Sequence, residues 1–312
     1  MKRASNLYNN IYKFENILTC YNEIIKNTKN KNMVNKYNMY KCINITKVYN
    51  DLKKKNYKVG KFNIFYIYEP KKRRIVSQSM YDKLINHLVS RYILYPSIIP
   101  CLIDTNCASR PNKGTRYALD LYFKYRNYMY YKYKKYYILK CDIKNYFGSI
   151  NIDILKEKIR NKIKDKDALN IVYNILDSDT NLPIGFMTSQ ILGIYYLNDL
   201  DYYIKENLKI KCYVRYQDDF ILFHNNKEYL KECLEKIIIF LKKEKLVINN
   251  KTRIYTNKNN IIFLGKDKYN KKSKYREKNR KLKLKKYLYE NNRINLNSYL
   301  STYINYGGNV WK

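Results

Sequence analysis

The amino-acid sequence predicts a mixed helix-and-sheet protein, of the α/β class in its α+β form. Two patterns carry this prediction: short apolar runs that suit strands, and longer segments with apolar residues at three- and four-residue spacing that suit helices. The chain has 312 residues, of which 46% are hydrophobic, so a sizeable core can form. No internal repeat and no linker rich in proline, glycine or serine divides it, and we therefore expect lobes of one molecule.

The first half of the chain is expected to change from helix to strand and back to helix. The expected elements are, in order, a basic helical lead-in over 1–60, a strand over 61–68, a helix over 79–94 and a helix that is capped by Thr115. The strand shows period two and stops before Pro70. Pro96 and Pro100 are expected to end the helix over 79–94.

The second half combines buried strands with amphipathic helices. Strands are expected over 136–143, 212–214, 220–223 and 261–265, and helices over 151–163, 189–207 and 230–243. The polar residues 215–219 separate two apolar runs, which predicts a hairpin with its turn there. The first of these strands ends in Asp142, so a carboxylate is delivered at the edge of a buried strand.

The charge balance points to a polyanionic partner. The chain holds 63 Lys and Arg against 26 Asp and Glu, for a formal net charge of +37. Such self-repulsion is best tolerated beside nucleic acid. A second explanation stays open for part of the excess, because AT-rich coding favours Lys, Asn, Tyr and Ile.

The cysteine pattern and the hydropathy indicate a soluble, cytoplasmic protein. Seven cysteines without a C-x-x-C pair and only two histidines argue against a zinc site and against a disulfide framework. Unpaired thiols fit a reducing cytosol. No apolar run approaches the roughly 20 residues of a membrane span, so we expect no membrane partner.

Three carboxylates form a candidate metal site. Asp218 and Asp219 are adjacent at a hairpin tip, where each loses hydration and repels the other unless a divalent cation neutralises them. If Asp142 lies on a neighbouring strand, the three could hold two Mg²⁺ ions about 3.5 to 4 Å apart for phosphoryl transfer, with Mn²⁺ as an alternative. A solvated turn is the other interpretation of an isolated Asp-Asp pair.

Several segments resemble the motifs of bacterial reverse transcriptases. Residues 140–150 resemble the first catalytic motif, 182–190 the template- and nucleotide-positioning motif, and 213–220 the Tyr-x-Asp-Asp motif. Further similarities are Arg74 to the finger motif, 113–115 to the turn before the palm, 250–252 to the fourth palm motif and 263–265 to the primer grip. The resemblance covers residues 61–265.

The resemblance implies a right-hand polymerase. Residues 1–135 would form the N-terminal region and fingers, residues 136–265 a palm of antiparallel sheet and helices with a finger insertion over 151–180, and residues 266–312 a small, basic, helical thumb. Residues 266–286 carry twelve Lys and Arg against two acids. This segment is either a solvated tail or a helix with one basic side.

The resemblance also assigns roles to individual residues. The catalytic residues would be Asp142, Asp218 and Asp219, which would also bind metal together with the carbonyl of Ile143. The dNTP would contact Arg74, Lys144, Asn145, Tyr146, Phe147, Ile184, Gly185, Gln217 and Lys251. Nucleic acid would contact Lys113, Gly114, Ser189, Gln190, Phe263, Leu264, Gly265, Lys281, Lys283, Lys285 and Lys286.

Two of these roles compete with simpler ones. Phe147 falls at the position of the family's steric gate, where an aromatic ring crowds a ribose 2′-hydroxyl and selects dNTPs; the simpler interpretation is a core Phe. Lys251 matches a residue that would protonate the departing pyrophosphate, whereas many lysines in so basic a chain are ordinary surface residues.

The implied activity is that of an RNA-directed DNA polymerase, a nucleotidyltransferase that uses an RNA template, a DNA or RNA primer and dNTPs. Ile184-Gly185 and Ser189-Gln190 replace the commoner Gln-Gly and Ser-Pro, and this form resembles the enzymes of diversity-generating retroelements. Such enzymes work with a small basic accessory protein; a structured non-coding RNA is another expected partner. The alternatives are an antiphage-defence reverse transcriptase and a non-catalytic RNA-binding protein, in which the tyrosines would stack on unpaired bases.

Overall fold

The chain separates into two compact units. The computed structural model describes residues 3–68, 73–267 and part of the C-terminal segment, namely residues 282, 284–293, 295, 296, 299 and 300. The first unit comprises residues 1–63 and 76–258, and the second comprises residues 64–75 and 259–312. In the described part of the chain, no helix is long and apolar enough to cross a membrane.

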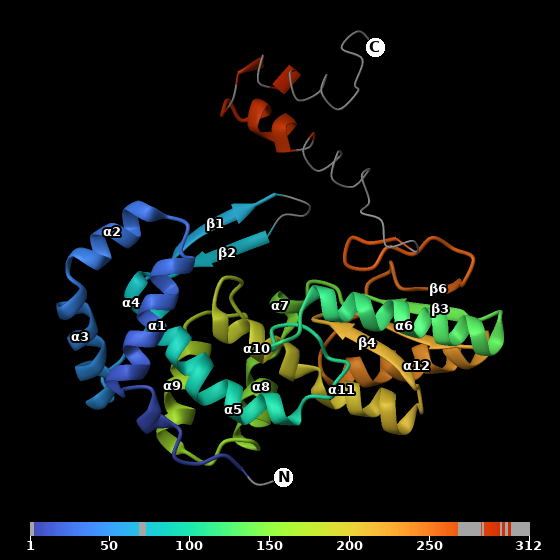
Figure 1. The fold of residues 1–312 in the computed structure, drawn as a ribbon, viewed down its shortest axis with the longest axis horizontal. Coiled ribbons are helices and arrows are strands. Elements are labelled where there is room, and N and C mark those ends of the chain that lie inside the picture. The colour runs from blue at the N-terminus through green and yellow to red at the C-terminus, as the bar shows by residue number, and fades with distance from the viewer. Residues whose placement is uncertain are drawn as a thin grey trace. The chain divides into compact units, whose positions relative to one another are not determined.

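The first unit begins with helices, as the sequence predicts. They are η1 (Tyr8–Asn10), α1 (Phe14–Asn27), α2 (Lys31–Met39) and α3 (Lys41–Lys53), and α1 packs against α3 and against α4 (Met80–Val89) (Figure 1). In α1 the side chains of Ile17, Cys20 and Ile24 are fully buried. Their spacing of three and four residues places them on one helical face, which explains why this segment packs as a helix.

The helix expected over 79–94 continues beyond Pro96. Ser79 caps α4 by accepting a hydrogen bond from Asp82 N, and the chain then runs through η2 (Ser90–Leu94), α5 (Tyr95–Ile98) and η3 (Ile99–Cys101). Pro96 and Pro100 therefore do not end the helical path, and that expectation is wrong. Each lies in the first turn of a new helical segment, where the missing N–H needs no partner.

An antiparallel four-stranded sheet forms the other part of the first unit. Its strands are β3 (Tyr137–Cys141), β4 (Cys212–Tyr216), β5 (Asp219–His224) and β6 (Arg253–Thr256), in the order β4-β5-β3-β6. The register pairs Cys141 with Phe220 and Tyr216 with Asp219. The expected buried strand before Asp142 and the expected hairpin are both confirmed. β6 lacks the apolar pattern of the others and was not predicted.

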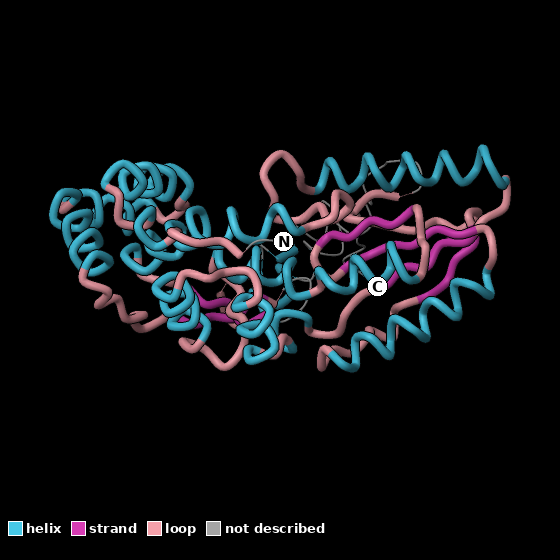
Figure 2. The backbone as a smooth tube through the Cα atoms, turned by 90° about the horizontal axis from the view of Figure 1, so that it is seen from below, coloured by secondary structure: helices cyan, strands magenta, loops and turns pink. Residues whose placement is uncertain are grey.

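Long helices cover both faces of this sheet. α6 (Thr115–Tyr133) packs against β4 and β5, and α12 (Lys227–Lys243) packs against β3, β5 and β6 (Figure 2). The strands can bury both faces because apolar side chains continue on either side of the pleat: Leu222 lies in the main core, and the neighbouring Phe223 packs against Tyr122 of α6. The helix expected after residue 114 is confirmed, but Thr115 is its first residue and the N-cap is Gly114, so the expectation that Thr115 caps the helix is wrong.

The remaining helices connect the sheet to the N-terminal helices. They are α7 (Tyr146–Ser149), α8 (Ile152–Arg160), α9 (Lys166–Leu176), α10 (Met187–Tyr196), α11 (Asn198–Tyr202) and η4 (Tyr203–Asn207). Asn151 caps α8 through Ile154 N, in agreement with the helix expected there. The helix expected over 189–207 is three segments: it is interrupted at Leu197 between α10 and α11, and α11 continues directly into η4.

The second unit contains a two-stranded sheet and a short helical stretch. β1 (Asn63–Ile67) pairs with β2 (Arg73–Ser77), which confirms the strand expected over 61–68, and residues 284–290 are helical. The strand expected over 261–265 is wrong. Phe263 and Lys266 exchange two backbone hydrogen bonds around Leu264 and Gly265, whose φ angles of 49° and 82° form a tight turn.

Candidate active site

Three aspartates gather at one end of the four-stranded sheet. β3 and β5 pair up to Cys141 and Phe220, so one further step of the register places Asp142 opposite Asp219. Asp218 lies in the turn between β4 and β5. This turn is narrower than the expected 215–219: strand pairing continues to Tyr216 and resumes at Asp219, and Gln217 takes a φ of 57°.

The electrostatics of Asp219 reflect the other two carboxylates. Burial raises the pKa of Asp219 to about 6; the Lys140 ammonium acts in the opposite direction, and the charges of Asp142 and Asp218 add to the rise. The Lys140 Nζ atom lies 3.5 Å from Asp219 Oδ2. Lys140 and Asp142 share one face of β3, which is why the lysine reaches across to β5.

The three aspartates fit a divalent cation. Asp219 Oδ1 is buried and has no hydrogen-bond partner within the described residues. Within the same residues, no three His, Cys, Asp or Glu side chains are drawn together into a complete metal cluster. The like charges of Asp142 and Asp218 act on Asp219, and a hard cation with oxygen ligands is the group that would offset this repulsion.

Asn249 fixes the carboxylate of Asp142. Its Nδ2 atom donates to Asp142 Oδ2 at 2.8 Å, and its backbone N–H donates to the Asp142 carbonyl at 2.7 Å. The backbone N–H of Asp142 in turn donates to Thr252 Oγ1 at 3.3 Å. The next residue, Ile143, forms an isolated bridge with Ile248. Sequence reasoning missed Asn249, although it directly precedes the recognised segment 250–252.

A buried ion pair supports the hairpin of β4 and β5, which carries the Tyr-x-Asp-Asp motif. Arg215 Nε donates to Asp201 Oδ1 at 2.6 Å, and both side chains are fully buried. Tyr213 donates from its hydroxyl to the same carboxylate at 2.6 Å. Arg215 Nη1 also donates to the Gln217 carbonyl at 2.9 Å, so this cation holds the turn that carries Asp218.

Phe147 lies against a glycine of α10. A Cβ atom built on Gly193 would lie 3.3 Å from Phe147 Cε1 and 3.4 Å from Gln217 Oε1. The hydroxyl of the buried Tyr146 donates to the Gly193 carbonyl. Phe147 is half-buried, whereas Gly193 is buried. Because position 193 has no side chain, the Phe147 ring can approach helix α10 closely.

Within the first unit, the segment before α10 is fixed to Val76 through the backbone. Val76 N–H donates to the Ile184 carbonyl at 2.9 Å, and any Cβ on Gly185 would lie only 2.2 Å from the Val76 carbonyl oxygen. Gly185 also has a φ of 130°, so the position admits only glycine without a backbone shift. The Ile184 side chain is half-buried.

Polar contacts link α10 to the hairpin turn. Gln217 Nε2 donates to Ser109 Oγ at 3.1 Å and to the Gln190 carbonyl at 3.4 Å. Ser109 Oγ donates to Gln190 Oε1 at 3.4 Å. Gln190 is exposed, whereas Ser189 is 1% exposed, so Ser189 can act on nucleic acid only through its neighbours.

Several other predicted site residues are exposed, already paired or part of the second unit. Lys144, Asn145 and Lys251 are exposed, and the Lys113 ammonium is already paired with the Asp104 carboxylate. Arg74, Phe263, Leu264, Gly265, Lys285 and Lys286 belong to the second unit, whereas Lys281 and Lys283 lie outside the described residues. The first unit therefore brings together the three aspartates, Phe147 and Gln217.

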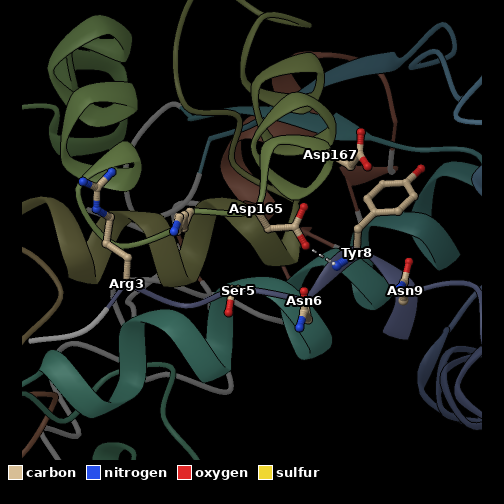
Figure 3. Close-up of a pocket in the computed structure, with 8 residues that line it drawn as sticks. Arg3, Ser5, Asn6, Tyr8, Asn9, Asp165 and Asp167 are labelled. Carbon is tan, nitrogen blue, oxygen red and sulfur yellow. Dashed lines mark hydrogen bonds between the residues drawn. The ribbon is translucent and has the colours of Figure 1, made fainter.

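A cavity of about 680 Å³ lies elsewhere, between the N-terminal segment and the start of α9 (Figure 3). Its carboxylates are used for structure. Asp165 accepts hydrogen bonds from the backbone N–H groups of Leu7 and Tyr8 at 2.8 and 2.9 Å, and Asp167 pairs with Lys55 at 2.7 Å. We therefore assign no catalytic role to this cavity.

Comparison with known proteins identifies the class of the chain. Residues 52–267 match the family described as reverse transcriptase (RNA-dependent DNA polymerase), and the chain belongs to that family. It is 31% identical over 113 residues to the Retron Ec73 reverse transcriptase of Escherichia coli. That alignment covers 32% of this chain and 36% of the relative, so it spans about a third of the relative's length.

Solved structures confirm the fold. A truncated apo telomerase from Candida tropicalis matches with a TM-score of 0.52 at 17% identity, over 68% of this chain and 53% of that one. Telomerase from Candida albicans, in complex with a fragment of telomeric RNA, matches with a TM-score of 0.50 at 13% identity, over 69% and 45% of the two chains. At these identities the likeness concerns the fold alone, which is of the reverse transcriptase and telomerase kind.

Proposed function

We propose that this protein is an RNA-directed DNA polymerase that extends a primer on an RNA template with dNTPs. The observation that carries the proposal is the convergence of Asp142, Asp218 and Asp219 at one end of the sheet, in a chain of the reverse transcriptase family. A non-catalytic RNA-binding protein has no use for three mutually repelling carboxylates, one of which has a buried oxygen without a hydrogen-bond partner among the described residues.

Asp142, Asp218 and Asp219 would hold two Mg²⁺ ions, with the Ile143 carbonyl as a further oxygen ligand. Once bound, the ions would supply the charge that activates the primer hydroxyl and stabilises the leaving pyrophosphate. The protein's own part is to position these ligands: Asn249 fixes the Asp142 carboxylate, and Arg215 fixes the turn that presents Asp218. Lys140 limits the repulsion at Asp219.

Primer extension tests the proposal. Purified full-length protein should incorporate dNTPs on an RNA template annealed to a DNA or RNA primer, and EDTA should abolish incorporation that Mg²⁺ or Mn²⁺ restores. RNA binding that is unaccompanied by any metal-dependent extension, with every primer type supplied, would favour the non-catalytic alternative.

Gly193→Ala is expected to sharpen the selection of dNTPs over rNTPs. In the proposed enzyme Phe147 is the steric gate, and a methyl group at position 193 would lie 3.3 Å from Phe147 Cε1, so the ring would have to shift away from α10. The ratio of kcat/KM for dNTP to that for rNTP should rise roughly threefold to tenfold. Single-nucleotide incorporation with paired dNTP and rNTP substrates measures this ratio.

The Phe147→Ala background provides the control for that measurement. If Gly193 acts through the ring, adding Gly193→Ala to Phe147→Ala leaves the ratio unchanged. A change of equal size in both backgrounds would mean that position 193 acts through helix α10 and not through the gate.

Ile184→Gln is expected to lower misincorporation. The apolar Ile184 side chain offers no hydrogen bond near the incoming nucleotide, and one polar contact is worth about 1 to 3 kcal/mol, which is roughly tenfold in error rate. Sequencing of cDNA made by both proteins on one template measures the effect, which should be largest opposite template adenine. Identical error spectra would show that position 184 does not set fidelity.

For the biological system we propose a diversity-generating retroelement, with a small basic accessory protein or a structured RNA as a partner. The Ile184-Gly185 and Ser189-Gln190 pairs support this choice. An antiphage-defence reverse transcriptase is the second candidate. A uniformly faithful parent enzyme in the sequencing experiment would favour the defence role.

A further inference from the structure

The C-terminal end of α6 carries a concentrated, solvent-exposed set of tyrosines and lysines. Residues 124–135 hold five Lys or Arg, five Tyr and no acid. We use the name Tyr–Lys surface for the exposed tyrosines and lysines at the end of this segment, namely Tyr128, Tyr130, Tyr131, Lys132, Tyr133, Lys134 and Lys135. The four tyrosines are 45%, 53%, 77% and 37% exposed in that order, which is far more than packing of a helix end requires.

The rings and the cations of this surface are close together. Lys132 Nζ lies 5.7 Å from the ring centre of Tyr128 and 5.1 Å from that of Tyr133, and Lys134 Nζ lies 5.3 Å from that of Tyr130. A ligand that stacks on a ring would therefore meet a positive charge beside it. Bases joined by phosphates offer that combination of a flat face and a negative charge.

The base of the surface is firmly attached to the sheet. Met129 is buried between the exposed tyrosines, and the ring centre of the buried Tyr122 lies 5.8 Å from that of Phe223 in β5. Asn257 Nδ2 donates to the Lys134 carbonyl at 2.9 Å and ties the helix end to the segment after β6. The exposed rings thus stand on a fixed support, which lowers the entropy cost of binding.

The surface lies at the end of the sheet away from the aspartates. α6 begins beside the hairpin turn, where Thr115 Oγ1 donates to the Tyr216 hydroxyl at 3.3 Å. Tyr131 lies about 24 Å further along the helix axis at 1.5 Å per residue. β3 starts next to this helix end and delivers Asp142 at its opposite end. A short primer-template at the aspartates would therefore not need the Tyr–Lys surface.

We propose that the Tyr–Lys surface binds an unpaired, single-stranded segment of RNA that lies outside the primer-template duplex. Stacking needs exposed base faces, which an unpaired strand has and a duplex hides. The lysines would contact the phosphates without reading sequence. The choice of RNA over single-stranded DNA rests on the proposed function, in which the template is RNA.

Binding measurements without dNTPs test this site independently of catalysis. One variant, Tyr130→Ser with Tyr131→Ser, removes rings and keeps every charge; a second, Lys132→Gln with Lys134→Gln and Lys135→Gln, keeps the rings. The matched control is Lys29→Gln with Lys31→Gln and Lys36→Gln, which removes the same charge from exposed positions around α2. The probes are a 20-nucleotide unpaired RNA, single-stranded DNA of the same sequence and an RNA hairpin.

The ring variant should bind the unpaired RNA about fivefold to fiftyfold more weakly, and it should bind the hairpin as the parent does. The lysine variant should lower the slope of log affinity against log salt by about 2, at about 0.7 for each phosphate contact of a single strand. Extension of a short primer-template should be unchanged in both variants, provided that the parent is active.

Three outcomes would contradict the proposal that the Tyr–Lys surface binds unpaired RNA. If the ring variant binds unpaired RNA as the parent does, the tyrosines do not stack on bases. If the α2 control loses as much RNA affinity as the lysine variant, the effect of the lysines is one of net charge alone. A larger loss with single-stranded DNA than with RNA rejects RNA as the ligand. A parent that binds RNA at the Tyr–Lys surface but never polymerises would contradict the proposed activity and leave the site standing.

Discussion

Asp218→Asn should abolish RNA-templated DNA synthesis while the protein stays folded. Asparagine keeps the volume of aspartate and removes the negative charge that the proposed metal site needs. The loss of several kcal/mol of charge stabilisation corresponds to a fall in kcat on the order of 10³-fold or more. Primer extension measures the rate, and thermal unfolding together with RNA affinity checks that the fold and the binding surface remain.

Asp177→Asn is the matched control. Asp177 is an exposed carboxylate that pairs with Lys156 and lies outside the group of three aspartates, so its variant should polymerise as the parent does. Asp142→Asn should match Asp218→Asn, and the double variant should be little worse than either, since both serve one site. A soluble, folded Asp218→Asn protein with near-normal incorporation would contradict the active-site assignment.

The strands that deliver the aspartates are predictable because their signal is local. A strand formed by an apolar run that stops at a carboxylate has its apolar residues in the core and its carboxylate at the edge of the sheet. This pattern located Asp142 and the β4–β5 hairpin correctly. The turn was predicted as five residues wide, because charged and polar residues look like loop. Arg215 shows the error in that inference: a charged residue can extend a buried strand when a partner neutralises it.

Tertiary pairing explains what the sequence does not reveal. Asn249 acts on Asp142 from 107 positions away in the chain, and an asparagine in a Lys/Asn-rich sequence carries no distinguishing signal. Asp201 offered a weak signal, since it is an acid within the apolar stretch 191–204, where a charge needs a partner. The strand predicted over 261–265 is wrong because the apolar residues there give the pattern of a strand. Positive φ angles at Leu264 and Gly265 bend the chain into a turn instead.

Of the substitutions proposed for this protein, one that breaks the buried Arg215–Asp201 pair should lower the free energy of unfolding most. Asp201→Asn keeps the volume and leaves the Arg215 guanidinium without its anion at a site with no exposed surface. Removing one partner of a buried pair costs about 3 to 5 kcal/mol of unfolding free energy. The same substitution should also reduce polymerisation, because Arg215 holds the Gln217 carbonyl and thereby the turn with Asp218.

Urea unfolding of three variants separates the charge effect from general disruption. The exposed Lys55–Asp167 pair gives the matched control: Asp167→Asn should cost less than about 1 kcal/mol, since water screens that pair. Arg215→Met combined with Asp201→Leu replaces the buried charges by apolar groups and should recover much of the stability that Asp201→Asn loses, without restoring polymerisation. If Asp201→Asn proves no more destabilising than Asp167→Asn, the buried pair does not support the hairpin, and the turn with Asp218 must be held by its strand pairing alone.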